Sequence, residues 1–190
     1  MLAANLPIGG FLSQLQPMLL DRRFEVATAA GIGSLFAGAI ALGRLGSGWL
    51  VDRLWAPAVA GFFLCLPAIG ALVLVLVERP SVALAGAAAA FLGLAQGAEA
   101  DFLAYLVPKY FGLRSYGAIF GSLLMIVSLA LASGAVFFGL THDHFGSYRP
   151  ALVVSIGAYL TAAACILASG ISRSRTRALS APATLGTGGR

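Results

Sequence analysis

Long apolar runs constrain the fold of this chain more than any other feature of its sequence. Each is close to the roughly 20 residues that a helix needs to cross a bilayer. The runs are continuous and rich in Ala, Leu and Gly, whereas the strands of a membrane β-barrel alternate apolar and polar residues. Only 10% of the residues are charged, against about a quarter in a soluble domain. Six runs can be drawn, over 2–20, 26–51, 56–77, 82–107, 116–140 and 151–171.

These runs predict an all-α integral membrane protein with six transmembrane helices, forming one bundle over residues 1–171. The polar remainder, 172–190, has no apolar face, and we expect it to be a disordered cytoplasmic tail. Basic residues favour the cytoplasmic side, and more of them fall on the side that carries the two termini. We therefore expect a multi-pass protein of the cell membrane, inner or plasma, with both termini cytoplasmic. The net charge of +5 then reflects topology rather than binding to nucleic acid.

One arginine lies inside the second apolar run. Arg44 stands eight residues before Asp52, which on a helix places it about 12 Å deeper in the bilayer. An arginine near the middle of a membrane helix costs roughly 3 kcal/mol or more, and by default it marks a functional site. The alternative is a structural role, in which Arg44 pairs with Asp52 or Asp101 and braces the bundle.

A carboxylate lies at a similar depth in the fourth run. Glu99 is about 15 Å from Lys109 along a helix, so its depth allows it to meet Arg44. A carboxylate buried in a membrane pairs with a cation or carries a proton. Glu99 is therefore the candidate for proton coupling, and a static ion pair is the alternative. Gln96 lies three residues earlier and shares the helix face of Glu99.

Polar residues interrupt the first run. Asn5, Gly9, Ser13 and Gln16 lie within about 80° of one another on a helix, so they share a face. Such a face predicts the wall of a water-filled cavity. The alternative is hydrogen bonding to a neighbouring helix. The third and sixth runs, by contrast, are plainly apolar and predict outer helices that face lipid.

Two helix exits carry the same spacing of glycine and aspartate. Gly48 precedes Asp52, and Gly139 precedes Asp143, by four residues each. The two exits are three runs apart and fall on opposite sides of the predicted membrane. This is the pattern expected of an inverted repeat of three helices.

The stretch from Gly48 to Arg53, Gly-Trp-Leu-Val-Asp-Arg, resembles the Gly-x-Leu-x-Asp-Arg loop of the major facilitator superfamily of secondary transporters. The basic continuation of that loop is missing here. The oxalate carriers of the superfamily have a lysine in the helix that matches the fifth run, and its absence here argues against a dicarboxylate substrate. Three further stretches are similar to segments of bacterial monocarboxylate and oxalate carriers of this superfamily: 97–101, 108–117 and 139–151.

The resemblance implies the C-terminal six-helix half of such a carrier, built from two inverted three-helix repeats. It implies that a missing N-terminal half, or a second copy of the chain, completes the protein. It also implies that Arg44 binds a substrate carboxylate. Gly48, Asp52 and Arg53 would then form a conformational latch against the positive end of a helix in the other half.

We therefore expect a secondary carrier, proton-coupled or exchanging, for a small organic anion such as a monocarboxylate. The alternatives are a non-transporting six-helix fragment or subunit, or a carrier or efflux pump for an uncharged or cationic molecule. We expect no enzyme activity, cofactor or metal, because the only histidines, His142 and His144, fall in an outer loop and no glycine-rich phosphate loop precedes a helix. The candidate substrate-binding residues are Arg44, Glu99, Gln96, Asn5 and Gln16.

Overall fold

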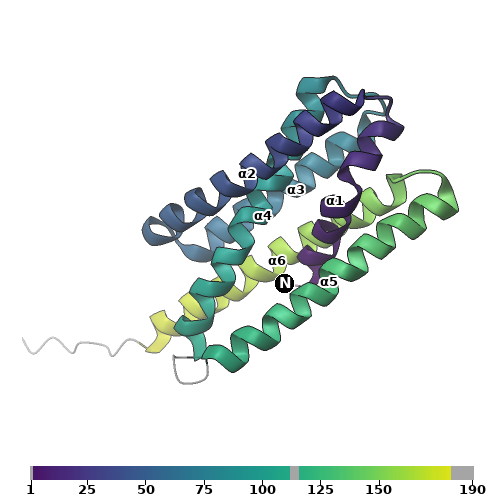
Figure 1. Cartoon of the computed structure of the whole chain (residues 1–190). Coiled ribbons are helices and arrows are strands. Elements are labelled where there is room, and N and C mark those ends of the chain that lie inside the picture. The colour runs from purple at the N-terminus through teal and green to yellow at the C-terminus, as the bar shows by residue number, and fades with distance from the viewer. Residues whose placement is uncertain (1, 112–115, 181–190) are drawn as a thin grey trace, which may run out of the picture.

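The computed structural model describes the backbone of residues 2–111 and 116–180, and the side chains of 4–55, 58–99 and 116–168. Helices account for nearly all of this part of the chain, and it contains no strand, which confirms the all-α prediction (Figure 1). The helices are α1 (Leu2–Asp21), α2 (Val26–Arg53), α3 (Ala56–Leu76), α4 (Val82–Phe111), α5 (Tyr116–Phe145) and α6 (Arg149–Ser180).

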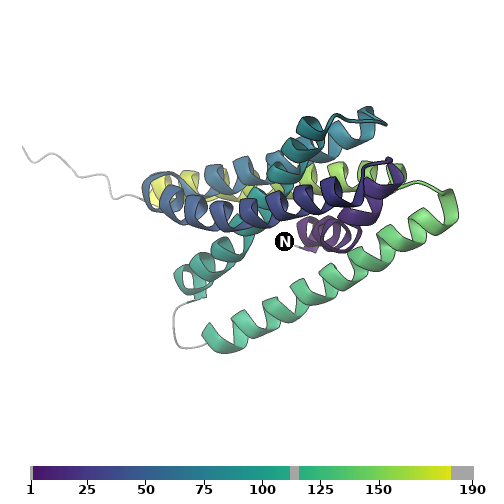
Figure 2. The same ribbon diagram turned by 45° about the horizontal axis from the view of Figure 1, so that its top comes forward.

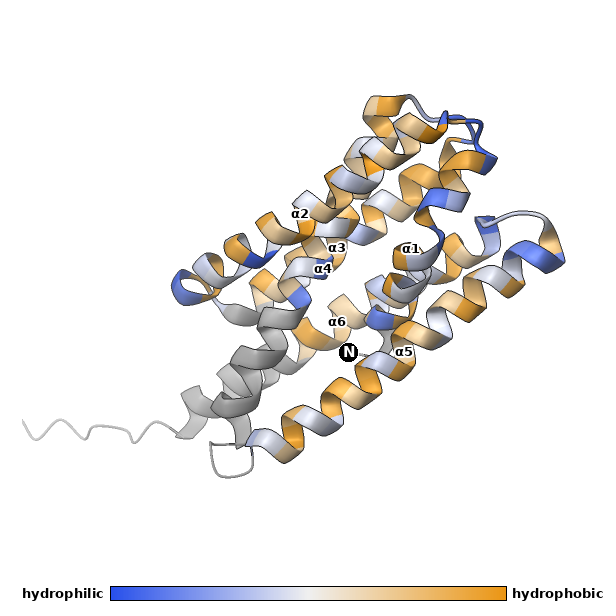
Figure 3. Ribbon diagram, viewed as in Figure 1, coloured by the Kyte–Doolittle hydropathy of each residue, from blue (hydrophilic) through white to orange (hydrophobic). Residues whose placement is uncertain are grey.

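Five of these helices, α2 to α6, are long and apolar enough to cross a membrane. Hydrophilic residues gather mainly at the ends of the bundle, while its long middle is hydrophobic (Figure 3). The chain is therefore a multi-pass membrane protein by length and composition. The remaining helix, α1, is not among the five, because Asn5, Gln14, Gln16 and Asp21 lower its hydropathy. The sixth crossing stays a prediction.

The last helix is longer than its apolar run. α6 continues to Ser180, whereas the sequence predicted that the helix ends near Ile171. Arginine, alanine and leucine are good helix formers, so a helix that leaves the membrane has no reason to stop at the first polar residue. The disorder expected of the tail stays a prediction, and residues 181–190 lie outside the described part of the chain.

The helices pack in three main pairs, α2 with α4, α1 with α5, and α3 with α6. α3 also contacts α4, and α1 also contacts α6. α5 lies along one edge of the bundle, beside α1 (Figure 2). That the third and sixth runs are outer helices facing lipid stays a prediction, since burial within this chain alone does not test it. Half of the α3 span is buried, against 17% of the α5 span, because α3 packs against both α6 and α4.

The α2–α4 pair is held by glycines that meet main-chain carbonyls. A side-chain carbon added at Gly43 would overlap the carbonyl oxygen of Leu94, and one added at Gly97 would overlap that of Ile40. In both helices, the carbonyl that the partner's glycine contacts belongs to the residue three positions before the helix's own glycine. Close backbone approach of this kind is how membrane helices associate, since lipid gives them no hydrophobic driving force.

The α1–α5 pair is built in the same way. A side-chain carbon at Gly134 would overlap the carbonyl oxygen of Leu6, and one at Gly9 would overlap that of Leu131. The spacing is the same: Leu6 lies three positions before Gly9, and Leu131 lies three positions before Gly134. The two pairs therefore share one reciprocal contact, made from the same spacing in four different helices.

Candidate functional site

A carboxylate and an amide meet in the interior, where α1 approaches α4. Asn5, which is only 2% exposed, donates a hydrogen bond from Nδ2 to Oε1 of Glu99 at 2.5 Å. Asn5 is the buried amide of α1 and Glu99 is a carboxylate inside α4, and both were candidates from the sequence. The structure brings them into direct contact.

Three further oxygens in this region are buried and have no hydrogen-bond partner among the described residues. They are Oε2 of Glu99, Oε1 of Gln96 and the hydroxyl of Tyr159. Gln96 and Glu99 lie one turn apart on the same face of α4. Tyr159 comes from α6 and is fully buried, and the charge of Glu99 acts on its hydroxyl. We refer to Asn5, Gln96, Glu99 and Tyr159 as the interior polar cluster.

Tyr159 was not among the candidate residues predicted from the sequence. It lies in a run that was interpreted as an outer, lipid-facing helix, and a tyrosine is common near lipid headgroups. One signal was present, because Tyr159 stands eight positions after the start of the run rather than at an end. A buried tyrosine usually needs a partner for its hydroxyl, so a tyrosine at that depth indicates a polar site.

Arg44 does not reach the interior polar cluster. Its side chain is exposed, and it forms no ion pair with Glu99. The reason is the rotation of α2: Gly43 and Ser47 are buried and Gly43 meets α4, so Arg44 is turned about 100° from the contact. Equal depth was therefore a poor guide to contact. An ion pair with Asp101 cannot be described, because the side chain of Asp101 lies outside the described residues.

The predicted polar face of α1 is divided in the structure. Asn5 is buried, while Ser13 and Gln16 are exposed. The Ser13 hydroxyl donates to the carbonyl of Gly9 at 2.9 Å, within its own helix. Gln16 lies toward Gly33 of α2, where its side-chain amide is the nearest group. Gln16 is therefore separate from the interior polar cluster.

The proposed latch residues lie at the exposed end of α2. Asp52 and Arg53 are both exposed, and a side-chain carbon at Gly48 would meet nothing within 4 Å. The Arg53 guanidinium lies 4.1 Å from the centre of the Trp49 ring, a cation–π contact. This end of α2 is open to a partner, as a latch requires.

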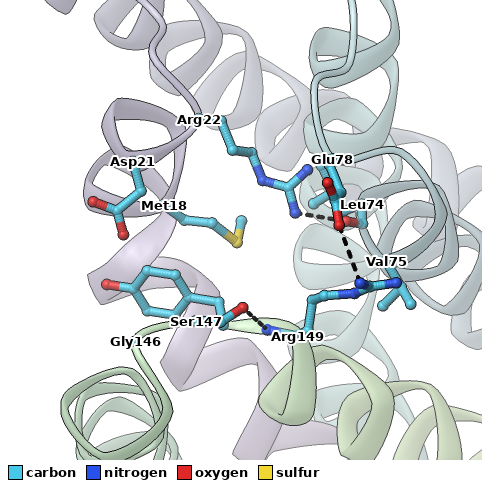
Figure 4. Close-up of a pocket in the computed structure, with 10 residues that line it drawn as sticks. Met18, Asp21, Arg22, Leu74, Val75, Glu78, Gly146, Ser147 and Arg149 are labelled. Atoms are coloured by element: carbon cyan, nitrogen blue, oxygen red, sulfur yellow. Dashed lines mark hydrogen bonds and ion pairs between the residues drawn. The ribbon is translucent and has the colours of Figure 1, made fainter.

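A cavity of about 200 Å³ opens at the end of the bundle where α1 and α3 finish and α6 begins (Figure 4). Arg22 closes one side of it by donating to the carbonyls of Val77 at 2.7 Å and Leu74 at 2.5 Å. These are carbonyls at the end of α3 that the helix itself leaves unsatisfied. Burial, together with repulsion from Arg149, lowers the pKa of Arg22 from its ordinary value. Across the cavity, Arg149 pairs with Glu78 at 3.2 Å.

A chain of contacts lies beside this cavity. His142 Nε2 lies 2.7 Å from the Asp21 carboxylate, and the His142 ring stacks on Tyr148 with 4.4 Å between ring centres. The Tyr148 hydroxyl donates to Oε1 of Gln14 at 3.1 Å. Burial, with the charges of Asp21 and Asp143, raises the pKa of Tyr148. These contacts tie the end of α1 to the α5–α6 connection, and no group of three His, Cys, Asp or Glu in the described chain is placed to hold a metal ion.

Replacing Arg22 with Ala should lower the stability of the folded protein by about 2 kcal/mol, because two charged hydrogen bonds to the end of α3 are lost. Arg23→Ala is the matched control, since Arg23 is adjacent, exposed and makes no such bonds. Thermal unfolding of the purified protein in detergent compares the two. Equal melting temperatures for both variants would contradict a stabilising role for Arg22.

Comparison of the chain with family models, with curated proteins and with solved structures gave no match. A function is therefore proposed from the geometry of the chain itself.

Proposed function

We propose that this chain is one six-helix half of a secondary transporter of the major facilitator type, built from two inverted three-helix repeats. The observation that carries the proposal is the reciprocal glycine–carbonyl contact. If α1 corresponds to α4 and α2 corresponds to α5, then the α2–α4 pair corresponds to the α1–α5 pair, and the two pairs make the same glycine–carbonyl contacts. Asp52 also follows Gly43 at the same interval at which Asp143 follows Gly134. Repeats of three helices run in opposite directions through a membrane, as in many carriers.

A second six-helix unit would complete the transporter, either the N-terminal half or a second copy of the chain. The open face supports this proposal. α2 and α5 have the least buried spans, and glycines on both have nothing within 4 Å of an added side-chain carbon, among them Gly31, Gly38, Gly117 and Gly121. Small residues of this kind let another helix approach closely. Arg44 and the latch residues are exposed on the same helix, α2.

The proposed substrate is a small organic anion such as a monocarboxylate. The planar guanidinium of Arg44 matches a carboxylate with two parallel hydrogen bonds. Arg44 is exposed on α2, which supports a role in a cavity between two halves. Glu99 would take up a proton in one stage of the cycle and release it in another. Asn5 donates to Glu99 and supports its ionised form. Gln96 and Gln16 would contribute hydrogen bonds from the cavity wall.

One observation favours a second candidate, a carrier or efflux pump for a cationic or uncharged molecule. Glu99 forms no ion pair with any cation whose side chain the structure describes. A carboxylate without a counter-ion inside a membrane protein attracts a cation. In this alternative Glu99 would bind the substrate, and Arg44 would serve only in packing or topology.

Replacing Arg44 with Gln should abolish uptake of a labelled monocarboxylate while the protein still inserts, because the amide keeps the length of the side chain but loses its charge and its fork of donors. Uptake is measured in proteoliposomes that contain the native full-length polypeptide. Arg79→Gln, an exposed arginine in the α3–α4 connection, is the control and should transport normally. Normal uptake by the Arg44→Gln variant would overturn the assignment and favour the cationic or uncharged substrate.

A further inference from the structure

The carboxyl group of Glu99 is only half satisfied in the structure. Oε1 accepts from Asn5, whereas Oε2 is buried without a partner among the described residues. A buried charge without compensation is too costly to be stable in a membrane interior. No arginine, lysine or histidine with a described side chain pairs with it. A cation that is not among the described side chains would therefore stabilise Glu99 in its ionised form.

The groups around Glu99 determine the chemistry of that partner. The unpartnered atoms are a carboxylate oxygen, an amide oxygen of Gln96 and the hydroxyl of Tyr159. All are hard oxygen ligands, without the nitrogen or sulfur that transition metals prefer. The cluster has one negative charge, so a monovalent ion balances it, whereas a divalent ion would leave a net positive charge in the hydrocarbon.

Tyr159 provides an independent indication of a ligand. Its side chain is fully buried and its hydroxyl has no partner within the described chain. Such a hydroxyl costs folding energy unless something binds to it. Phenylalanine would fill the same space without that cost, so the hydroxyl is best explained by a bound species.

We propose that the interior polar cluster binds one small alkali cation, Na⁺ or Li⁺, through Glu99, Gln96 and Tyr159. Asn5 holds the carboxylate in place by donating to its other oxygen. A role for this cation as the coupling ion of transport rests on the proposed function. Its binding does not, because the site requires no substrate and no second half.

The test is thermal unfolding of the purified native protein in detergent, followed by the fluorescence of Trp49 and Trp55. Na⁺ is titrated against choline, which is too large for the site, at constant ionic strength. Wild-type protein should show a saturable rise of several degrees in Tm, as for any ligand that binds only the folded state. Glu99→Gln should lose this rise. Glu78→Gln is the control, since Glu78 is an exposed carboxylate at the end of the bundle, and it should keep the rise.

Tyr159→Phe gives a second readout that mere damage to the fold would not produce. In choline this variant should be at least as stable as the wild type, because it removes an unpartnered buried hydroxyl. In Na⁺ the order should reverse, and the half-saturating Na⁺ concentration should increase several-fold. An equal Tm for wild-type protein in Na⁺, Li⁺ and choline would overturn the proposal. So would a Na⁺-dependent rise that both variants retain in full.

The outcome separates this proposal from the proposed function. If uptake is driven by a proton gradient but alkali cations do not shift the Tm, the proposed cation site is contradicted and the proposed transporter is supported. If the Tm shift depends on Glu99 but the protein transports nothing, the cation site is supported and the proposed transporter is contradicted.

Discussion

Replacing Glu99 with Gln should abolish accumulation of substrate driven by a pH gradient. Gln has the size of Glu, and its amide oxygen still accepts the hydrogen bond from Asn5, so the contact between α1 and α4 is kept. What is lost is the only carboxyl group of the interior polar cluster, because the amide of Gln does not bind and release a proton in this way. Transport that needs a proton to move with the substrate should therefore stop.

Exchange of labelled for unlabelled substrate need not stop in this variant, since exchange requires no net proton movement. The measurement compares both modes in the same proteoliposomes, with Glu78→Gln as the matched carboxylate outside the cluster. Accumulation at the wild-type level in the Glu99→Gln variant would exclude Glu99 as the coupling group. Loss of both modes, in protein that is folded, would instead assign Glu99 to substrate binding.

Replacing Gly43 or Gly134 with Ala should strongly destabilise the bundle. At each position the added carbon would overlap a main-chain carbonyl of the partner helix, at Leu94 and Leu6 respectively. A carbonyl cannot rotate away as a side chain can, so the two helices must separate. Overpacking costs roughly 1 to 3 kcal/mol. We expect the upper part of that range, because separating the two helices at one glycine also loosens the contact at the second glycine of the same pair.

The chain offers a control for this prediction. Gly157 in α6 lies outside both helix pairs, and an added carbon meets nothing within 4 Å there. Ala at Gly157 should be neutral or raise stability by up to about 1 kcal/mol, from its better helix propensity. Melting temperatures and the yield of monodisperse protein report the difference. Equal tolerance of Ala at all three positions would contradict the close contacts and, with them, the repeat.

The helices were predictable from the sequence because long apolar runs leave a membrane protein few choices. The predicted starts agree with the structure to within two residues. Helix ends agree less well, and α6 shows why: its polar residues are compatible with a helix, so composition alone did not mark Ser180 as the end. The pairing of helices was beyond reach, since it depends on which glycine faces which carbonyl.

The candidate site was predicted in part. Glu99, Gln96 and Asn5 stood out because polar residues are rare in apolar runs, and the structure places them in one region. Arg44 stood out for the same reason, yet the rotation of α2 turns it away, and rotation is set by packing at Gly43 rather than by depth. Tyr159 was missed because the apolar ring of a tyrosine does not interrupt an apolar run, although its hydroxyl is polar. The Asp21–His142 contact was also missed, because it joins helix ends far apart in the sequence.

The most direct test of the proposed transporter is uptake by the native full-length polypeptide in sealed proteoliposomes with a pH gradient across the membrane. A panel of labelled monocarboxylates, organic cations and neutral solutes covers the substrate classes at issue. The account predicts that at least one small monocarboxylate accumulates above its external concentration, and that an uncoupler abolishes the accumulation. Absence of gradient-driven movement for every member of the panel, with protein that is folded and inserted, would contradict it.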